Sequence, residues 1–122
     1  KKVNNNYLVF TQNGKNNTGL DPVNLSIKFQ EHGAGEIVIN SITQDGSMKG
    51  YDTDLIQEIY KGINIPMTAI GGAGSLNDID NLFKQFGVIG AGAGSLFVFK
   101  GIYRAVLINY PNSAEKSFFY EK

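Results

Sequence analysis

Three glycine-rich segments contain the residues whose types and spacing could do chemistry. They are Asp45-Gly46-Ser47, Gly71-Gly72-Ala73-Gly74-Ser75 and Gly94-Ser95, and each follows a stretch of small or apolar residues. Glycine lets the backbone approach a ligand closely, and N–H groups at the start of a helix point toward an anion. Three such segments at one end of a sheet would form a phosphate site, whereas a single one could equally be a tight turn.

Two carboxylates stand at positions where they could act on a substrate. Asp45 lies among the glycines, where a general acid or base would stand, but it could equally cap the turn at Gly46. Glu36 lies at the start of the first apolar stretch, so it would be at the opposite end of the sheet, paired or exposed to solvent. Neither Gly71-Gly72-Ala73-Gly74 nor Gly90-Ala91-Gly92-Ala93-Gly94 has the spacing G-x-G-x-x-G, so a dinucleotide-binding loop is not expected.

Composition excludes several other chemistries. The chain has 122 residues, no cysteine and a single histidine, His32, and its 11 Lys+Arg residues balance 11 Asp+Glu residues. Disulfides, thiol catalysis and cysteine-ligated zinc are excluded, and we expect no metal site and no cofactor. The charge balance gives no sign of nucleic-acid or membrane partners, and no apolar run is long enough to span a bilayer. We expect a cytoplasmic protein.

The segments before residue 36 predict a hairpin, a loop and a helix. Strand-forming residues flank an Asn cluster within residues 2–11, which favours a β-hairpin. Residues 13–19 are polar and favour a loop. Asp21-Pro22 is typical of a helix start, and Gly33 would end that helix.

A strand-loop-helix pattern then repeats. The expected strands are residues 36–42, 66–70 and 88–93; the expected helices are residues 53–60, ended by Gly62, and 76–86, ended by Gly87; residues 94–97 favour a short helical turn. Ser75 and Asp78 have the spacing of a capping box. The alternating glycines Gly90 and Gly92 would thin a strand so that neighbours pack closely. Such units in succession predict a parallel α/β fold.

The C-terminal end breaks this pattern. Residues 104–110 are rich in apolar and β-branched residues and stop at Pro111, which favours an extended segment rather than a helix. We expect one domain over residues 1–111 and a loose C-terminal tail over residues 112–122.

Four motifs in this order resemble the HisF family, the cyclase subunits of imidazole glycerol phosphate synthase. They are Gly33-Ala34-Gly35-Glu36, Asp45-Gly46-Ser47-Met48-Lys49-Gly50-Tyr51-Asp52, Gly71-Gly72-Ala73-Gly74 and Ala93-Gly94-Ser95-Leu96-Phe97. Members of this family are TIM barrels of histidine biosynthesis. The resemblance covers roughly residues 1–100 and only the C-terminal half of the barrel, so it implies parallel strands 6 to 8 plus a hairpin in the loop after strand 5.

The resemblance also implies roles for particular residues. The family takes ammonia from a glutaminase partner, HisH, and uses it to cleave and cyclise a ribulosyl phosphate intermediate to imidazole glycerol phosphate. Asp45 corresponds to an acid on strand 6 near the reaction centre, and Glu36 to a charged gate at the ammonia entrance. The residues that correspond to the family's phosphate grip are Gly46, Gly72, Gly94 and Ser95, and the loop pattern adds Gly71 to them. Those that correspond to a substrate-facing loop are Thr11, Asn13 and Gly14.

Departures from the family leave alternatives open. The two principal catalytic aspartates of the family lie on strands 1 and 5 and are not in this chain. Residues 94–111 of this chain resemble the WbuZ paralogues, which are thought to deliver ammonia for amidination of surface sugars. A noncatalytic ammonia conduit is a third interpretation. Because half a barrel leaves strand edges unpaired, we expect self-association or pairing with the missing N-terminal half.

Overall fold

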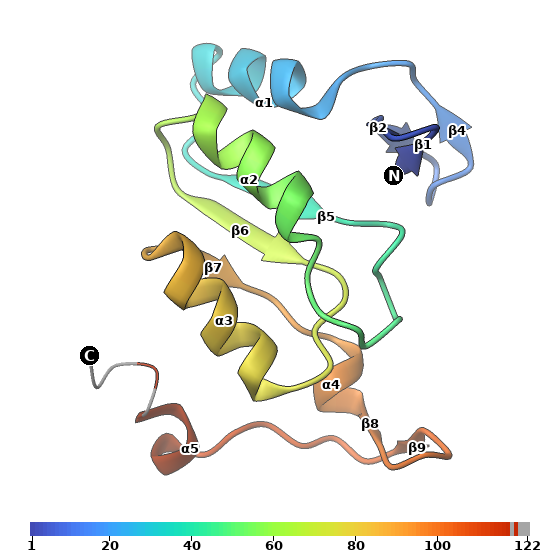
Figure 1. The fold of residues 1–122 in the computed structure, drawn as a ribbon, viewed down its shortest axis with the longest axis vertical. Helices are drawn as coiled ribbons and strands as arrows, with labels where there is room; N and C mark the ends of the chain where they lie inside the picture. Colours follow the sequence, from blue (N-terminus) through green and yellow to red (C-terminus); the bar gives the residue numbers. More distant parts are fainter. Residues whose placement is uncertain (118, 120–122) are drawn as a thin grey trace.

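A three-stranded parallel sheet, in the order β5-β6-β7, forms the centre of the fold. The computed structural model describes residues 1–117 and 119. Two helices, α2 and α3, connect the strands and lie over one face of the sheet (Figure 1). The α/β prediction is confirmed, and the described residues form an open sheet rather than a closed barrel. The bounds are β5 (Ile37–Asn40), α2 (Thr53–Gly62), β6 (Met67–Ile70), α3 (Leu76–Phe86) and β7 (Gly90–Ala91).

The two faces of the sheet differ in burial. Side chains alternate between faces along a strand, and Ile37, Met67 and Ala69 are buried in the core beneath the helices. Ile59 of α2 and Leu82 of α3 are 0% and 1% exposed and fill the centre of that core. On the other face, Val38 is 58% exposed. The face of the sheet turned away from α2 and α3 is therefore largely open in the described part of the chain.

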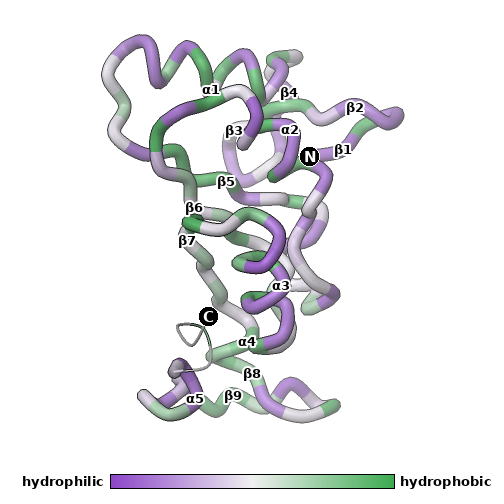
Figure 2. The backbone as a smooth tube through the Cα atoms, turned by 60° about the vertical axis from the view of Figure 1, so that its left-hand side comes forward, coloured by the Kyte–Doolittle hydropathy of each residue, from purple (hydrophilic) through white to green (hydrophobic). Residues whose placement is uncertain are grey.

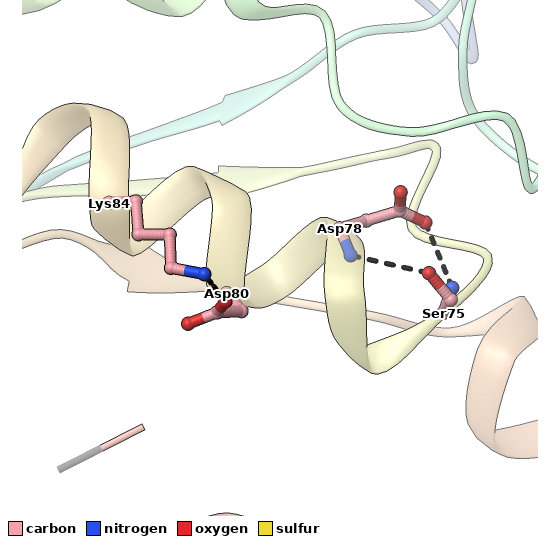
Figure 3. A network of polar contacts seen from close by, with 4 residues as sticks. All are labelled: Ser75, Asp78, Asp80 and Lys84. Atoms are coloured by element: carbon pink, nitrogen blue, oxygen red, sulfur yellow. Dashed lines mark hydrogen bonds and ion pairs between the residues drawn. The ribbon is translucent and has the colours of Figure 1, made fainter. Parts of the chain in front are cut away.

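Side-chain caps fix the helix starts. Asp21 accepts a hydrogen bond from the backbone N–H of Asn24 (2.8 Å) at the start of α1 (Pro22–Glu31). Ser75 and Asp78 form the predicted capping box of α3, and Asp80 and Lys84 form an ion pair one turn further along (Figure 3). No helix among the described residues is long and apolar enough to cross a membrane.

Gly62 is the last residue of α2, so the prediction that it ends the second helix is confirmed. A Cβ at Gly62 would lie 3.0 Å from Val23 Cγ1 and 3.5 Å from Ile27 Cδ1, both on α1. Besides ending the helix, this small residue lets α1 and α2 pack closely.

Two hairpins, rather than one hairpin and a loop, precede α1. β1 (Lys2–Val3) pairs with β2 (Asn6–Tyr7) as predicted, and Asn4 and Asn5 form the turn with φ of 47° and 68°. The predicted loop over residues 13–19 is partly wrong, because β3 (Phe10–Thr11) pairs with β4 (Asn16–Asn17). Positive φ at three consecutive residues, 12–14, allows this second turn.

The C-terminal part lies at the end of the molecule opposite α1 and has several hydrophobic positions (Figures 1 and 2). The short helical turn α4 (Ser95–Val98) leads into β8 (Phe99–Lys100), which pairs with β9 (Ala105–Val106). The prediction of an extended segment over residues 104–110 is confirmed only at β9. The loose tail is wrong at α5 (Ser113–Ser117), since Asn112 and Glu115 cap it reciprocally, at 2.8 and 2.9 Å. Residues 118 and 120–122 of that tail lie outside the described residues.

Candidate phosphate-binding site

A pocket of about 380 Å³ lies at the carboxyl ends of β5, β6 and β7. All three glycine-rich segments contribute to it, although they are far apart in the sequence. Because the strands are parallel, their carboxyl ends lie at the same edge of the sheet and bring the following loops together. The predicted residues that line the pocket are Asp45, Gly46, Gly71, Gly72, Gly94 and Ser95.

Gly72 sets the shape of the loop after β6. Its φ is +108°, a left-handed conformation that side chains rarely adopt. Its carbonyl accepts a hydrogen bond from the backbone N–H of Gly50 (2.9 Å), and a Cβ at Gly72 would lie 2.1 Å from the carbonyl oxygen of Gly50. The loops after β5 and β6 thus touch through their backbones, which leaves no room for a side chain here.

Close contact between β6 and β7 forms the next part of the wall. A Cβ at Gly90 would lie 2.0 Å from Thr68 Oγ1, and one at Gly92 would lie 2.3 Å from Ile70 Cγ2. The expectation that these glycines let neighbouring strands pack closely is confirmed. The Tyr51 hydroxyl donates to the carbonyl of Gly92 (2.9 Å). Burial, and then the charge of Asp78, raise the pKa of Tyr51 to about 12, so this donor stays protonated at neutral pH.

The start of α3 does not offer all of its N–H groups to a ligand. The Asp78 carboxylate accepts from the backbone N–H groups of Gly74 and Ser75, each at 2.9 Å; Figure 3 shows the bond from Ser75. These two donors are already satisfied. An anion in the pocket would therefore meet the backbone of Gly71 and Gly72 rather than the capped helix start.

Asp45 is the one ionisable residue that lines the pocket. Its backbone N–H donates to the carbonyl of Ser41 (2.8 Å), and this bond holds the turn in place. Its carboxylate is exposed and has no hydrogen-bond partner among the residues described, so it does not cap the Gly46 turn. Within the same residues, no group of three or more His, Cys, Asp or Glu side chains could hold a metal.

Several residues of the pocket wall were not predicted from the sequence. Asn40 is the polar last residue of β5, and the position expected for a Gly71 Cβ is 2.6 Å from its Oδ1. The rule that selected Asp45, a polar side chain where an apolar strand ends, would also have selected Asn40. Three apolar wall residues carried no such signal: Met48, Ile70 and Ala93.

Four predicted residues lie outside this pocket. Thr11, Asn13 and Gly14 belong to the β3-β4 hairpin and its turn; the Thr11 hydroxyl accepts from Asn16 Nδ2 (3.1 Å), and a Cβ at Gly14 would lie 3.2 Å from Ile42 Cγ2. Glu36 lies just before β5, at the opposite end of the strands, where its Oε1 accepts from the Thr68 hydroxyl (2.6 Å). The structure separates Glu36 from the pocket along the length of the sheet.

Comparison with known proteins identifies the family. The family described as "Histidine biosynthesis protein" matches residues 2–103 of the chain. The chain belongs to this family. Its members are TIM barrels, of which this chain holds adjacent parallel strands.

Three relatives illustrate the similarity. A Leptospira interrogans protein, provisionally named imidazole glycerol phosphate synthase subunit HisF, is 50% identical over 110 residues, which is 90% of this chain and 43% of that protein. The HisF subunit of Natranaerobius thermophilus is 40% identical over 110 residues, covering 90% and 44%. That of Sulfolobus acidocaldarius is 42% identical over 84 residues, covering 69% and 34%. The chain thus spans less than half the length of these relatives.

Proposed function

We propose that this chain is part of a HisF-type synthase subunit that uses ammonia to cleave and cyclise a ribulosyl phosphate intermediate to imidazole glycerol phosphate. The observation that carries the proposal is the pocket, where Asp45 and the three glycine-rich segments meet at the carboxyl ends of the strands. In TIM barrels this end of the strands is the catalytic face, and the last loops bind phosphate. The phosphate would lie against the loop backbone, and Asp45 would act as acid or base beside it.

Glu36 marks the other end of the proposed reaction path. Ammonia from a HisH-like glutaminase would enter near Glu36 and move along the open face of the sheet toward the pocket. The hydrogen bond from Thr68 fixes the Glu36 carboxylate at this end, and the exposed side chain of Val38 lies on the face between the two sites. We place the protein in the cytoplasm with this pathway.

The free edge of β5 supports a further part of the proposal. Among the strands that the structure describes, β5 pairs only with β6. A groove of about 630 Å³ runs beside β5, lined by apolar residues of α1 and β5 and by Lys1 and Glu36. Phe29, at this groove, is 52% exposed. An unpaired strand edge beside an apolar groove favours pairing with another strand. We propose that it pairs with the N-terminal half of the barrel, or with a second copy when that half is missing.

An activity assay tests the proposal. The full-length protein is given the ribulosyl phosphate intermediate and an ammonium salt, and the loss of substrate absorbance is followed. We expect ammonium-dependent turnover, and a kcat lowered about 100-fold or more in Asp45→Asn, since general acid-base groups contribute about 10²–10⁴-fold. Asp54→Asn is the matched control, because Asp54 is exposed on α2 and outside the pocket. A folded protein without turnover would contradict the proposal.

A HisF-like paralogue that delivers ammonia for amidination of surface sugars is the second candidate. The relatives with provisional HisF names match 85–90% of this chain, whereas three of the four plainly named HisF subunits match 68–69%. The longer match to the provisionally named relatives favours placing this chain in a subgroup with them. A noncatalytic ammonia conduit is the third candidate, and it predicts that Asp45→Asn leaves the pathway intact while Glu36→Ala impairs ammonia transfer. The reverse pattern would reject the conduit.

A further inference from the structure

The wall of the pocket lacks a positive charge. Its lining contains no lysine or arginine among the described residues, and its one ionisable group is the acidic side chain of Asp45. A phosphate monoester carries a charge between about −1.5 and −2 at pH 7. Backbone N–H groups alone would have to outweigh the repulsion by Asp45, so a cation close to the pocket would strengthen binding considerably.

Arg104, the only arginine in the chain, brings such a charge to the pocket. Its Nη2 donates to the carbonyl of Gly46 (3.2 Å), a residue that lines the pocket and lies next to Asp45. The two residues are 58 positions apart. The contact is therefore made by the fold and not by a local turn.

The β8-β9 hairpin holds Arg104 in this place. The turn between the strands is closed by a hydrogen bond from the Arg104 N–H to the Gly101 carbonyl (3.0 Å), with Arg104 at a φ of 48°. Its guanidinium stacks over the Phe99 ring, 4.9 Å from the centroid. Further bonds, from the N–H of Leu107 to Val98 and from that of Asn109 to Phe97, tie the returning strand to α4. Because α4 begins at Ser95, a wall residue, the hairpin is anchored directly on the pocket.

Most hydrogen-bond donors of Arg104 are free to meet a ligand. A guanidinium has five N–H donors, and the structure engages one of them. No carboxylate among the described residues lies within ion-pair distance of it. Arginine suits this task because its planar fork can hold two phosphate oxygens at once, which lysine cannot.

We propose that Arg104 is a specificity-determining residue that binds the phosphate group of the substrate from the edge of this pocket. The inference rests on the proposed function, since it names the group that recognises the phosphate at the same site. It also gives the β8-β9 hairpin a role: the hairpin carries a cation to an anion site that otherwise presents only backbone and a carboxylate.

Calorimetric titration of the full-length protein with inorganic phosphate tests this inference. We expect Arg104→Gln to weaken phosphate binding about tenfold or more, the range of one charge-assisted hydrogen-bonded contact. Arg104→Lys should recover part of the affinity, because it keeps the charge and loses the fork. Lys100→Gln is the matched control: it removes the same charge from the exposed strand β8 without a contact to the pocket, and we expect a change below about twofold.

The outcomes separate the two proposals. If the unaltered protein binds phosphate and Arg104→Gln binds it equally well, Arg104 has no role and the proposed function stands. Equal weakening in Arg104→Gln and Lys100→Gln would show a general charge effect and also overturn the inference. If the unaltered, folded protein binds no phosphate, the phosphate pocket itself fails, and the role of Arg104 with it.

Discussion

Replacing Gly72 by alanine is the substitution with the clearest structural consequence. The Ala side chain would have to be accommodated at a φ of +108° and 2.1 Å from the carbonyl oxygen of Gly50. A left-handed or more extreme conformation costs a side-chain residue about 1–3 kcal/mol. Forcing atoms into a filled space costs about another 1–3 kcal/mol. Because the obstructing atom belongs to the backbone, a change of side-chain rotamer cannot relieve the clash.

We therefore expect Gly72→Ala to lower the free energy of unfolding by about 2–6 kcal/mol, a large part of the about 5–15 kcal/mol typical of a protein. Urea denaturation followed by circular dichroism measures it, and the midpoint should fall by about 1 M or more. Gly35→Ala is the matched control, since nothing lies within 4 Å of its Cβ position and its φ is not left-handed; it should change the free energy by less than about 0.5 kcal/mol. Equal midpoints for the two variants would refute the contact between the loops.

Three further predictions concern the pocket wall, a helix cap and the free strand edge. The pKa of Tyr51 is raised to about 12 in the folded protein, from about 10 when unfolded. The protonated hydroxyl therefore contributes its full stabilisation below pH 10, and this contribution falls as the pH rises toward 12. Tyr51→Phe should lower the free energy of unfolding by about 1 kcal/mol at pH 7. Between pH 10 and 12, however, the variant should lose less of this free energy than the unaltered protein does, as measured by urea denaturation; parallel pH curves for the two proteins would contradict this. Ser75→Ala removes the cap of α3 and should cost about 1 kcal/mol, whereas an unchanged urea midpoint would count against the capping box. The 122-residue chain alone should sediment as a dimer or larger species at micromolar concentration, because β5 has a free edge; a single monomeric species would contradict that.

Most of the central elements could be predicted from local signals. The Asp21-Pro22 pair and the Ser75–Asp78 capping box mark helix starts because they satisfy N–H groups that the helix itself leaves free. The parallel strands could be predicted because each is a short run of mostly small or apolar residues that is followed by a glycine-rich segment. The glycines at the strand ends located the pocket for the same local reason, since their neighbours along the chain already show where each strand stops.

Some of the features that escaped prediction depend on contacts distant in the sequence. Gly62 ends α2 as predicted, but its second role, leaving space for Val23 and Ile27 of another helix, has no local signal. The contact of Arg104 with Gly46, 58 positions away, depends on tertiary structure that no local pattern encodes. The β8-β9 hairpin, by contrast, pairs residues close in the sequence, such as Phe99 and Val106. The cap at Asn112 was different: its N-x-x-E spacing was visible in the sequence and was overlooked.

The central claim is that the loops after β5, β6 and β7 together bind a phosphate group. Two-dimensional amide NMR of the full-length protein during titration with glycerol phosphate tests it most directly. We predict that the largest, saturable shifts occur at the amides of Gly46, Gly72, Gly94 and Ser95, with the amides of the β3-β4 hairpin unchanged. Shifts confined to other parts of the chain, or no saturable shift in a folded protein, would contradict the claim.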